Sequence, residues 1–154
     1  MIKDRDMQML GFFRNNARMP LTDMSKKTKI PVSTLFDRLK EYEKRKLIMK
    51  HTSLLDYKML GYDIKIQILI TANKTQKESL RKFLEKHPQV NTLFRVNNGF
   101  DFMIEAIFQD ISNFDEFTKQ LEQYEIQDKK EFFIMEEMKR EEFMTYKENI
   151  GIQR

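Results

Sequence analysis

The spacing of apolar residues along the chain changes once, near Tyr62. Before that point apolar residues recur every three or four positions, which is the period of an amphipathic helix. From Tyr62 on they alternate, and the isoleucines from Ile64 to Ile70 fall on one face of a half-buried strand. The sequence therefore predicts an all-helical part followed by a part that contains a sheet, in the α+β class.

Three helices are predicted in the first part, over Asp4–Asn15, Asp23–Lys27 and Ser33–Lys44. Pro20 ends the first helix region, and Thr22 is the predicted N-cap of the second helix. A tight turn at residues 28–30 joins the second and third helices, as in a helix-turn-helix. A short strand over Ile48–Thr52 is expected to follow.

The third helix has two distinct faces. Its apolar stripe consists of Val32, Leu35, Phe36, Leu39 and Tyr42. The residues turned away from the stripe are Thr34, Asp37, Arg38, Glu41, Lys44 and Arg45. An apolar side for the domain and a polar side for a DNA groove is the layout of a recognition helix. The alternative is an ordinary surface helix whose charged face is solvated.

The second part is predicted to follow the order βαββαβ, which is the ferredoxin-like arrangement with both helices on one face of an antiparallel sheet. Thr75 and Glu78 fit a capping box, and residues 97–99 (Asn-Asn-Gly) give a strong hairpin signal. The last strand is expected over Glu131–Met138. The predicted domains are a helix-turn-helix domain (1–52), a linker (53–61), the βαββαβ domain (62–143) and a C-terminal tail (144–154).

Composition excludes several classes of protein. The chain has no cysteine, which rules out disulfides and zinc ribbons, and neither His51 nor His87 lies in a metal-ligand motif. It has no apolar run near the ~20 residues of a membrane span, so we expect a cytoplasmic protein without a membrane partner. No paired nucleophile and base or phosphate-binding glycine loop is evident, and only 4 glycines occur. We therefore expect the protein to have no enzymatic activity and to bind no cofactor.

Charge is distributed unevenly along the chain. Residues 1–60 contain 14 lysines and arginines against 7 acidic residues, a balance of +7. Residues 61–154 contain 14 against 17, a balance of −3. A basic N-terminal part joined to a mildly acidic remainder is typical of a DNA-binding module with a separate second domain.

Short motifs occur in a fixed order from about Asp4 to Met138. In the first part they are Asp6 with Met9–Leu10, Asn16–Ala17–Arg18, and then Arg38, Glu43 and Ile48. In the second part they are Leu60–Gly61–Tyr62, Pro88 with Val90, and Gly99–Phe100–Asp101. Their order and spacing resemble the Lrp/AsnC (feast/famine) family of prokaryotic transcription regulators. The resemblance implies a helix-turn-helix joined to a RAM-type βαββαβ domain.

Three residues depart from the family pattern. Lys29 and Lys46 stand where the family commonly has glycine, and a position that needs a positive φ carries a penalty for any other residue. Pro31 replaces the usual serine cap of the recognition helix, and Ser33 is expected to take over that role. The docking of this helix is therefore expected to differ from the family pattern.

Recognition helices contact base edges with their early residues, while nearby cations hold phosphates. The predicted base contacts are Ser33, Thr34, Asp37 and Arg38. Arg38 suits guanine and Asp37 suits cytosine N4. The predicted phosphate contacts are Lys26, Lys27, Lys40, Lys44 and Arg45. Glu41 is expected to pair within the helix instead.

Two interpretations of the hairpin stay open. It is either only the turn that the sheet requires, or part of the small-molecule pocket that the resemblance implies, commonly for an amino acid. In the second case the candidate effector-binding residues are Asn97, Asn98, Gly99 and Asp101, with Asp101 holding an ammonium group.

The sequence as a whole predicts a sequence-specific DNA-binding transcription regulator with an amino acid or related metabolite as effector. Its expected partners are double-stranded DNA and further copies of itself, as a homodimer or as a tetramer or octamer. The alternatives are a low-specificity DNA-organising protein and a metabolite-sensing module that binds protein.

Overall fold

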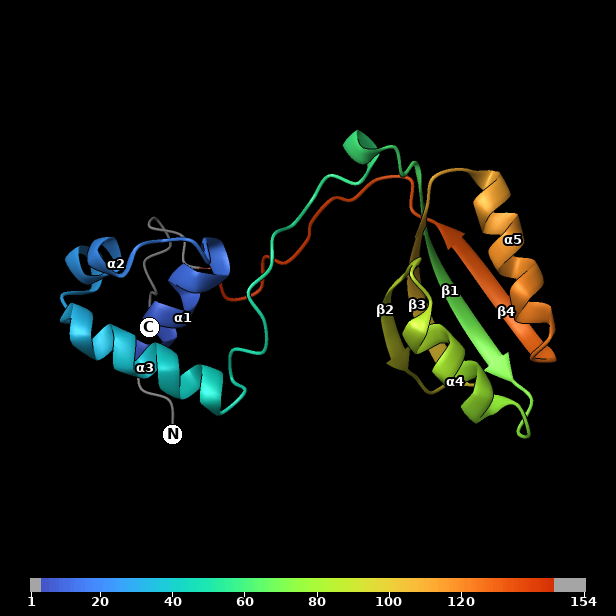
Figure 1. The fold of residues 1–154 in the computed structure, drawn as a ribbon, viewed down its shortest axis with the longest axis horizontal. Coiled ribbons are helices and arrows are strands. Elements are labelled where there is room, and N and C mark those ends of the chain that lie inside the picture. The colour runs from blue at the N-terminus through green and yellow to red at the C-terminus, as the bar shows by residue number, and fades with distance from the viewer. Residues whose placement is uncertain (1–3, 146–154) are drawn as a thin grey trace. The chain divides into compact units, whose positions relative to one another are not determined.

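The computed structural model describes residues 4–145 of the chain. These residues form two compact units (Figure 1). The helical unit consists of the described residues up to Leu54 together with those from Met138 on, and the sheet unit is Leu55–Glu137. Each unit has a hydrophobic core of its own, and the predicted α+β class is confirmed.

Three helices form the helical unit: α1 (Asp4–Asn15), α2 (Leu21–Thr28) and α3 (Val32–Lys44). Amphipathic spacing lets each helix turn one side inward. The buried core residues are Met9, Phe12, Met24, Ile30, Leu35 and Tyr42. The predicted three-helix arrangement with a short connection between the last two helices is therefore confirmed.

The turn between α2 and α3 places Lys29 in the left-handed region, with φ 58°. The Lys29 N–H donates to the Ser25 carbonyl (2.9 Å), and the Ser25 hydroxyl donates to the Ile30 carbonyl (2.6 Å). Lys46, after α3, also has a positive φ of 59°. Lys29 and Lys46 thus replace glycine at positions that do require left-handed backbone. This conformation costs an L-residue about 1–2 kcal/mol at each position.

Prolines precede both helices of the helix-turn-helix. Pro20 and Pro31 are the N-caps, with extended ψ values of 140° and 143°, and their carbonyls accept the first N–H groups of each helix. The predicted caps Thr22 and Ser33 are wrong, because each helix begins directly after its proline. The predicted strand over Ile48–Thr52 is also wrong, since these residues join no ladder.

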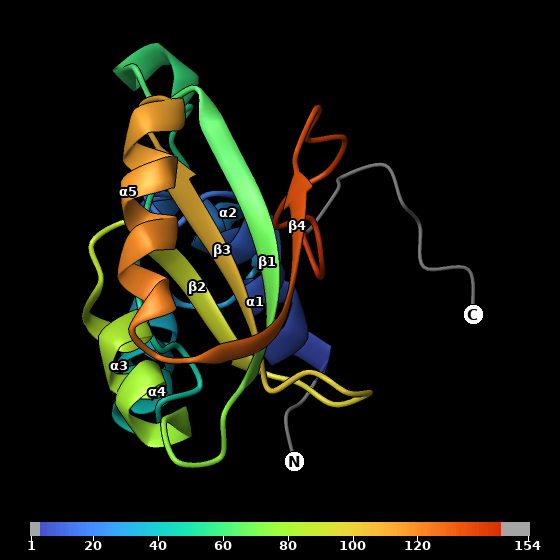
Figure 2. The ribbon, with the colours of Figure 1, turned by 90° about the vertical axis from the view of Figure 1, so that its right-hand side faces the viewer.

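The sheet unit begins with a short 3₁₀ helix, Lys58–Leu60. Its elements are then β1 (Ile64–Ala72), α4 (Lys77–Lys86), β2 (Val90–Arg95), β3 (Phe102–Phe108), α5 (Ile111–Glu122) and β4 (Ile126–Phe133). All strand pairs are antiparallel, in the order β2-β3-β1-β4. Figure 2 shows α4 and α5 on the same face of the sheet. The predicted ferredoxin-like βαββαβ arrangement is confirmed.

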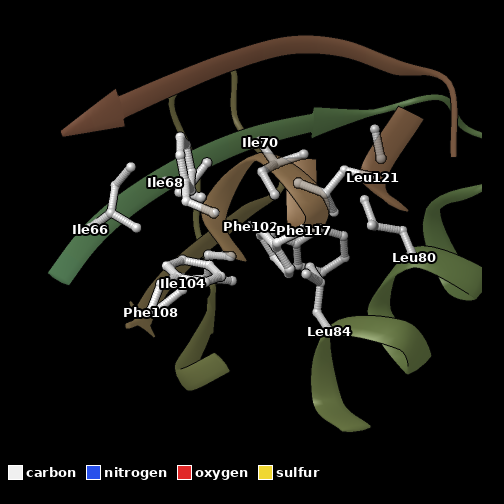
Figure 3. Packing of buried hydrophobic residues seen from close by; sticks show 13 residues of the cluster. Ile66, Ile68, Ile70, Leu80, Leu84, Phe102, Ile104, Phe108, Phe117 and Leu121 are labelled. Atoms are coloured by element: carbon white, nitrogen blue, oxygen red, sulfur yellow. The ribbon is translucent and has the colours of Figure 1, made fainter. Parts of the chain in front are cut away.

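Alternation along β1 creates the core of the sheet unit. Ile66, Ile68 and Ile70 point toward the helices and are fully buried. Side chains of α4 and α5, among them Leu84 and Phe117, complete the cluster (Figure 3). The opposite, open face of the sheet carries the alternate residues.

Two predictions in the sheet unit are wrong. Thr75 forms no capping box, because its hydroxyl donates to the Asn73 side chain (3.0 Å) and α4 begins only at Lys77. The last strand lies five residues earlier than predicted and spans Ile126–Phe133. Its first half is rich in charge, but main-chain pairing with β1 needs no apolar side chain, and an edge strand tolerates charges.

Residues 138–143, which the sequence assigned to the second domain, belong to the helical unit instead. The Arg14 guanidinium on α1 donates to the carbonyls of Glu141 (3.0 Å) and Phe143 (3.1 Å) and to the Glu141 carboxylate (2.8 Å). The chain thus returns to α1 after leaving the sheet unit. Most of the predicted tail, residues 146–154, lies outside the described residues.

Candidate nucleic-acid and effector sites

The outward side of α3 follows from the position of its core side. Successive residues turn by about 100°, and the side chains packed in the core are Leu35, Leu39 and Tyr42. The opposite side carries Ser33, Asp37, Lys40 and Lys44, and all four are exposed. The helix therefore presents a polar surface that spans its whole length.

Basic side chains lie on this surface and at the end of α2. Lys26, Lys27, Lys40, Lys44 and Arg45 are all exposed. Lys26 is paired with Asp23 (3.2 Å) and Arg45 with Glu41 (2.9 Å). The second pair confirms the predicted intrahelical role of Glu41. Such exposed pairs contribute little to stability and exchange readily for other partners.

Arg38 faces α1 instead of the outward side. Its Nη1 donates to Asp6 Oδ1 (2.5 Å), and the two side chains are only 26% and 11% exposed. Tyr42 joins the same cluster, and burial together with its hydrogen bond to Asp6 raises the pKa of Tyr42 to about 12. This arrangement favours a positioning role for Arg38 over the predicted guanine contact. Thr34 is likewise half-buried.

Two apolar residues of α3 were expected in the core and are not there. Val32 is 40% and Phe36 is 49% exposed, so their predicted place in the buried stripe is wrong. A helical wheel centred on Leu35, Leu39 and Tyr42 places Val32 at the edge of the core side and Phe36 on the flank between the core side and the outward side. Lys40 Nζ lies over the Phe36 ring, 5.6 Å from its centroid.

The hairpin between β2 and β3 is tight. Asn98 (φ 62°) and Gly99 (φ 88°) both have left-handed backbone, as the Asn-Gly signal indicated. Asn97, Asn98 and Gly99 are exposed. The Gly99 carbonyl accepts a hydrogen bond from the Thr71 hydroxyl (2.7 Å), which ties the turn to the end of β1.

Both carboxylate oxygens of Asp101 have partners within the sheet unit. One carboxylate oxygen accepts the Ala72 N–H (3.0 Å), and the other is paired with Lys77 on α4. The Lys77 ammonium lowers the pKa of Asp101, and the Ala72 N–H acts in the same direction. The carboxylate thus already has an ammonium partner, whereas Asn97 and Asn98 are exposed.

The open face of the sheet is partly apolar. Phe94 of β2 and Phe132 of β4 are about half exposed there, with Leu69 and Met103 between them. Lys65 lies on the same face and is paired with Glu105 (3.1 Å) and Glu137, which raises its pKa against the opposing effect of burial. A face of this composition suits contact with another protein surface.

Other kinds of site were sought among the described residues. A shallow groove of about 400 Å³ lies between α5 and β4. Within residues 4–145 no group of three or more His, Cys, Asp or Glu side chains is placed to hold a metal ion. None of the helices described is long and apolar enough to cross a membrane.

Comparison with known proteins agrees with this geometry. A family model described as the Lrp/AsnC ligand binding domain matches residues 65–143, more than half of the chain. The transcriptional regulator AzlB of Bacillus subtilis is 26% identical over 120 residues, 76% of each chain. The glutamate uptake regulatory protein of Zymomonas mobilis is 24% identical over 142 residues, 90% of this chain and 87% of that protein. These relatives are regulators and not enzymes.

Solved structures share the fold over most of its length. A transcriptional regulator from Neisseria meningitidis in complex with L-methionine superposes with a TM-score of 0.85 at 22% identity, covering 91% of this chain and 94% of that one. A feast or famine regulatory protein from M. tuberculosis, also complexed with L-methionine, has a TM-score of 0.84 at 13% identity, covering 91% and 96%. With a helix-turn-helix before the matched ligand-binding domain, the chain belongs to the Lrp/AsnC family of transcription regulators.

Proposed function

We propose that this protein binds specific duplex DNA sequences through α3 and regulates transcription there. The observation that carries the proposal is the outward side of α3, where Ser33, Asp37, Lys40 and Lys44 are exposed beside the lysines at the end of α2. Short polar side chains near the start of a recognition helix reach base edges, and lysines around them hold phosphates. Such a regulator works in the cytoplasm, where the chromosome of a prokaryote lies.

Footprinting on genomic DNA at rising salt tests this proposal. We expect a defined protected site that persists as non-specific binding falls away, because base contacts depend on salt much less than phosphate contacts do. Binding that falls steeply and protects no defined site would indicate a DNA-organising protein instead. Absence of duplex binding at low salt would overturn DNA binding altogether.

The open sheet face supports assembly into a homodimer. Phe94 and Phe132 stand on its two outer strands, so a second copy packed against this face would bury both in each protomer. A symmetric dimer would read two half-sites about one helical turn apart. Light scattering after gel filtration gives the mass of the assembly, tetramers and octamers included, and Phe132→Glu is expected to release monomers.

The hairpin supports an amino-acid effector. The side-chain amides of Asn97 and Asn98, both exposed residues, can donate to a carboxylate, and two proteins of the same fold were solved with L-methionine. Because Asp101 is paired with Lys77, we assign it to holding the turn in place. Calorimetric titration with a panel of amino acids tests the site. Asn97→Ala is expected to weaken binding, and Gln109→Ala, at the far end of β3, serves as the control.

A further inference from the structure

One flank of α3, between its core side and its outward side, carries an apolar patch. Val32 (40% exposed) and Phe36 (49% exposed) are four residues apart and therefore neighbours on the helix surface. The core of the helical unit is complete without them, since Leu35 and Tyr42 are buried and Leu39 packs against the same cluster. The patch thus has a surface role that core packing does not explain.

The surroundings of the patch are basic. Lys40 Nζ lies 5.6 Å from the centroid of the Phe36 ring, and Lys44 follows one turn later on the same side. An apolar protein partner would have to cover or neutralise these ammonium groups, and desolvating them is costly. A polyanion, in contrast, is attracted by these ammonium groups. The charge around Phe36 therefore favours nucleic acid as the occupant of this surface.

Duplex DNA offers one apolar group in its major groove, the C5-methyl group of thymine. Phe36 and Val32 lie in the first half of α3, the part of a recognition helix that approaches base edges. We propose that these two side chains contact thymine methyl groups and thereby select thymine in each half-site. This inference rests on the proposed DNA binding through α3. It states which side chains produce part of the sequence preference.

The test begins with duplexes selected from a random library by the full-length protein. Each thymine of the enriched half-site is replaced in turn by deoxyuridine, which removes the methyl group and leaves the pairing unchanged. We expect one or two of these replacements to weaken binding by about fourfold, the factor that burial of one methyl-sized group supplies. The other replacements should have no effect.

Phe36→Ala identifies the side chain responsible. The variant should bind thymine duplexes more weakly than the wild type by a similar factor. At one of the sensitive positions, uracil should then cause no further loss of affinity. Met49→Ala, an exposed apolar residue just after α3, should keep the full response to uracil. Because Phe36 is half exposed, the variant is expected to fold, and thermal melting checks this.

The outcomes separate two failures. If no sequence is enriched and no duplex is bound, the proposed DNA binding itself fails. If duplexes are selected and bound but no uracil replacement weakens binding, or if Phe36→Ala stays as sensitive as the wild type to every uracil replacement, only the methyl contact is overturned. A change in assembly mass for Phe36→Ala together with retained uracil sensitivity would make the patch a contact between copies.

Discussion

Asp6, Arg38 and Tyr42 form the one place in the described helical unit where charged groups enter the core. Asp6 is 8% exposed, and it contacts both the arginine and the tyrosine of α3. Breaking such a group by removing one partner leaves a poorly solvated charge, which costs more than the intact pair gains. The cluster therefore fixes the rotation of α3 against α1, and with it the set of residues that α3 turns outward.

A positioning role for Arg38 predicts a distinctive effect on DNA binding. Asp6→Ala and Arg38→Ala should both weaken binding to all duplexes by similar factors and leave the order of preferred sequences unchanged. The measurement is affinity for a panel of single-base variants of the selected duplex. The control is Asp115→Ala, which removes the exposed pair with Lys119 (2.7 Å) on α5. It should change neither the affinity nor the order of preferred sequences. Relaxed preference at one guanine for Arg38→Ala alone would restore the base contact predicted from the sequence.

Tyr42 predicts how stability depends on pH in the alkaline range. Its pKa is raised from 10.0 to about 12 in the folded protein, so the phenol favours folding while it stays protonated. This contribution is fully present below pH 10 and is lost as the pH rises from 10 to about 12. The free energy of unfolding of the wild type should fall faster over this range than that of Tyr42→Phe. Parallel curves would contradict the prediction.

The elements with strong periodicity could be predicted from sequence, and their ends could not. The isoleucines of β1, the Asn98–Gly99 turn and the helix over Asp4–Asn15 were all correct, because a single local pattern determines each. Helix starts were wrong at Pro20 and Pro31, where a main-chain carbonyl acts as cap and no side-chain signal exists. The start of β4 depends on pairing with a strand more than fifty residues away, which one sequence does not reveal.

The same limit applies to the candidate sites. Exposure of the lysines on α2 and α3 follows from helical spacing, and the sequence placed them correctly on the surface. The partners of Arg38 and Asp101 are set by contacts between elements, with Asp6 lying 32 residues from Arg38. Both were assigned to ligands because sequence alone does not show that a charge is already satisfied.

The turn between α2 and α3 offers a test at the level of the element. Lys29→Gly should raise the free energy of unfolding by roughly 1 kcal/mol, because glycine adopts the left-handed backbone without the Cβ penalty. The matched control is Lys26→Gly within α2, which should lower it by up to about 1 kcal/mol. Chemical denaturation measures both. A loss of stability for Lys29→Gly would show that the lysine side chain itself stabilises the turn.

The whole molecule divides its charge between its two units. Residues 1–54 and 138–154 together contain 17 lysines and arginines against 9 acidic residues, whereas residues 55–137 contain 11 against 15. A basic unit attracts DNA from a distance, and an acidic unit keeps the sheet domain from binding phosphates. We expect this division to concentrate contact with DNA on the helical unit.

Salt dependence measures that division. The logarithm of the binding constant should fall linearly with the logarithm of salt concentration, and Lys44→Ala should lower the slope by about 0.9 for each phosphate contact removed. Lys119→Ala, on α5 of the sheet unit, should leave the slope unchanged. Equal effects of the two variants would mean that the sheet unit also contacts DNA.

The return of the chain to Arg14 makes the sheet unit an insertion within the helical unit. The backbone passes between the units twice, near Leu54 and again near Met138. A proteolytic nick near Met138 therefore leaves the sheet unit and α1–α3 on one chain, whereas a nick near Leu54 severs the covalent link between them. After a nick near Leu54, the hydrogen bonds of Arg14 to Glu141 and Phe143 are among the non-covalent contacts that still hold α1 to the rest of the protein.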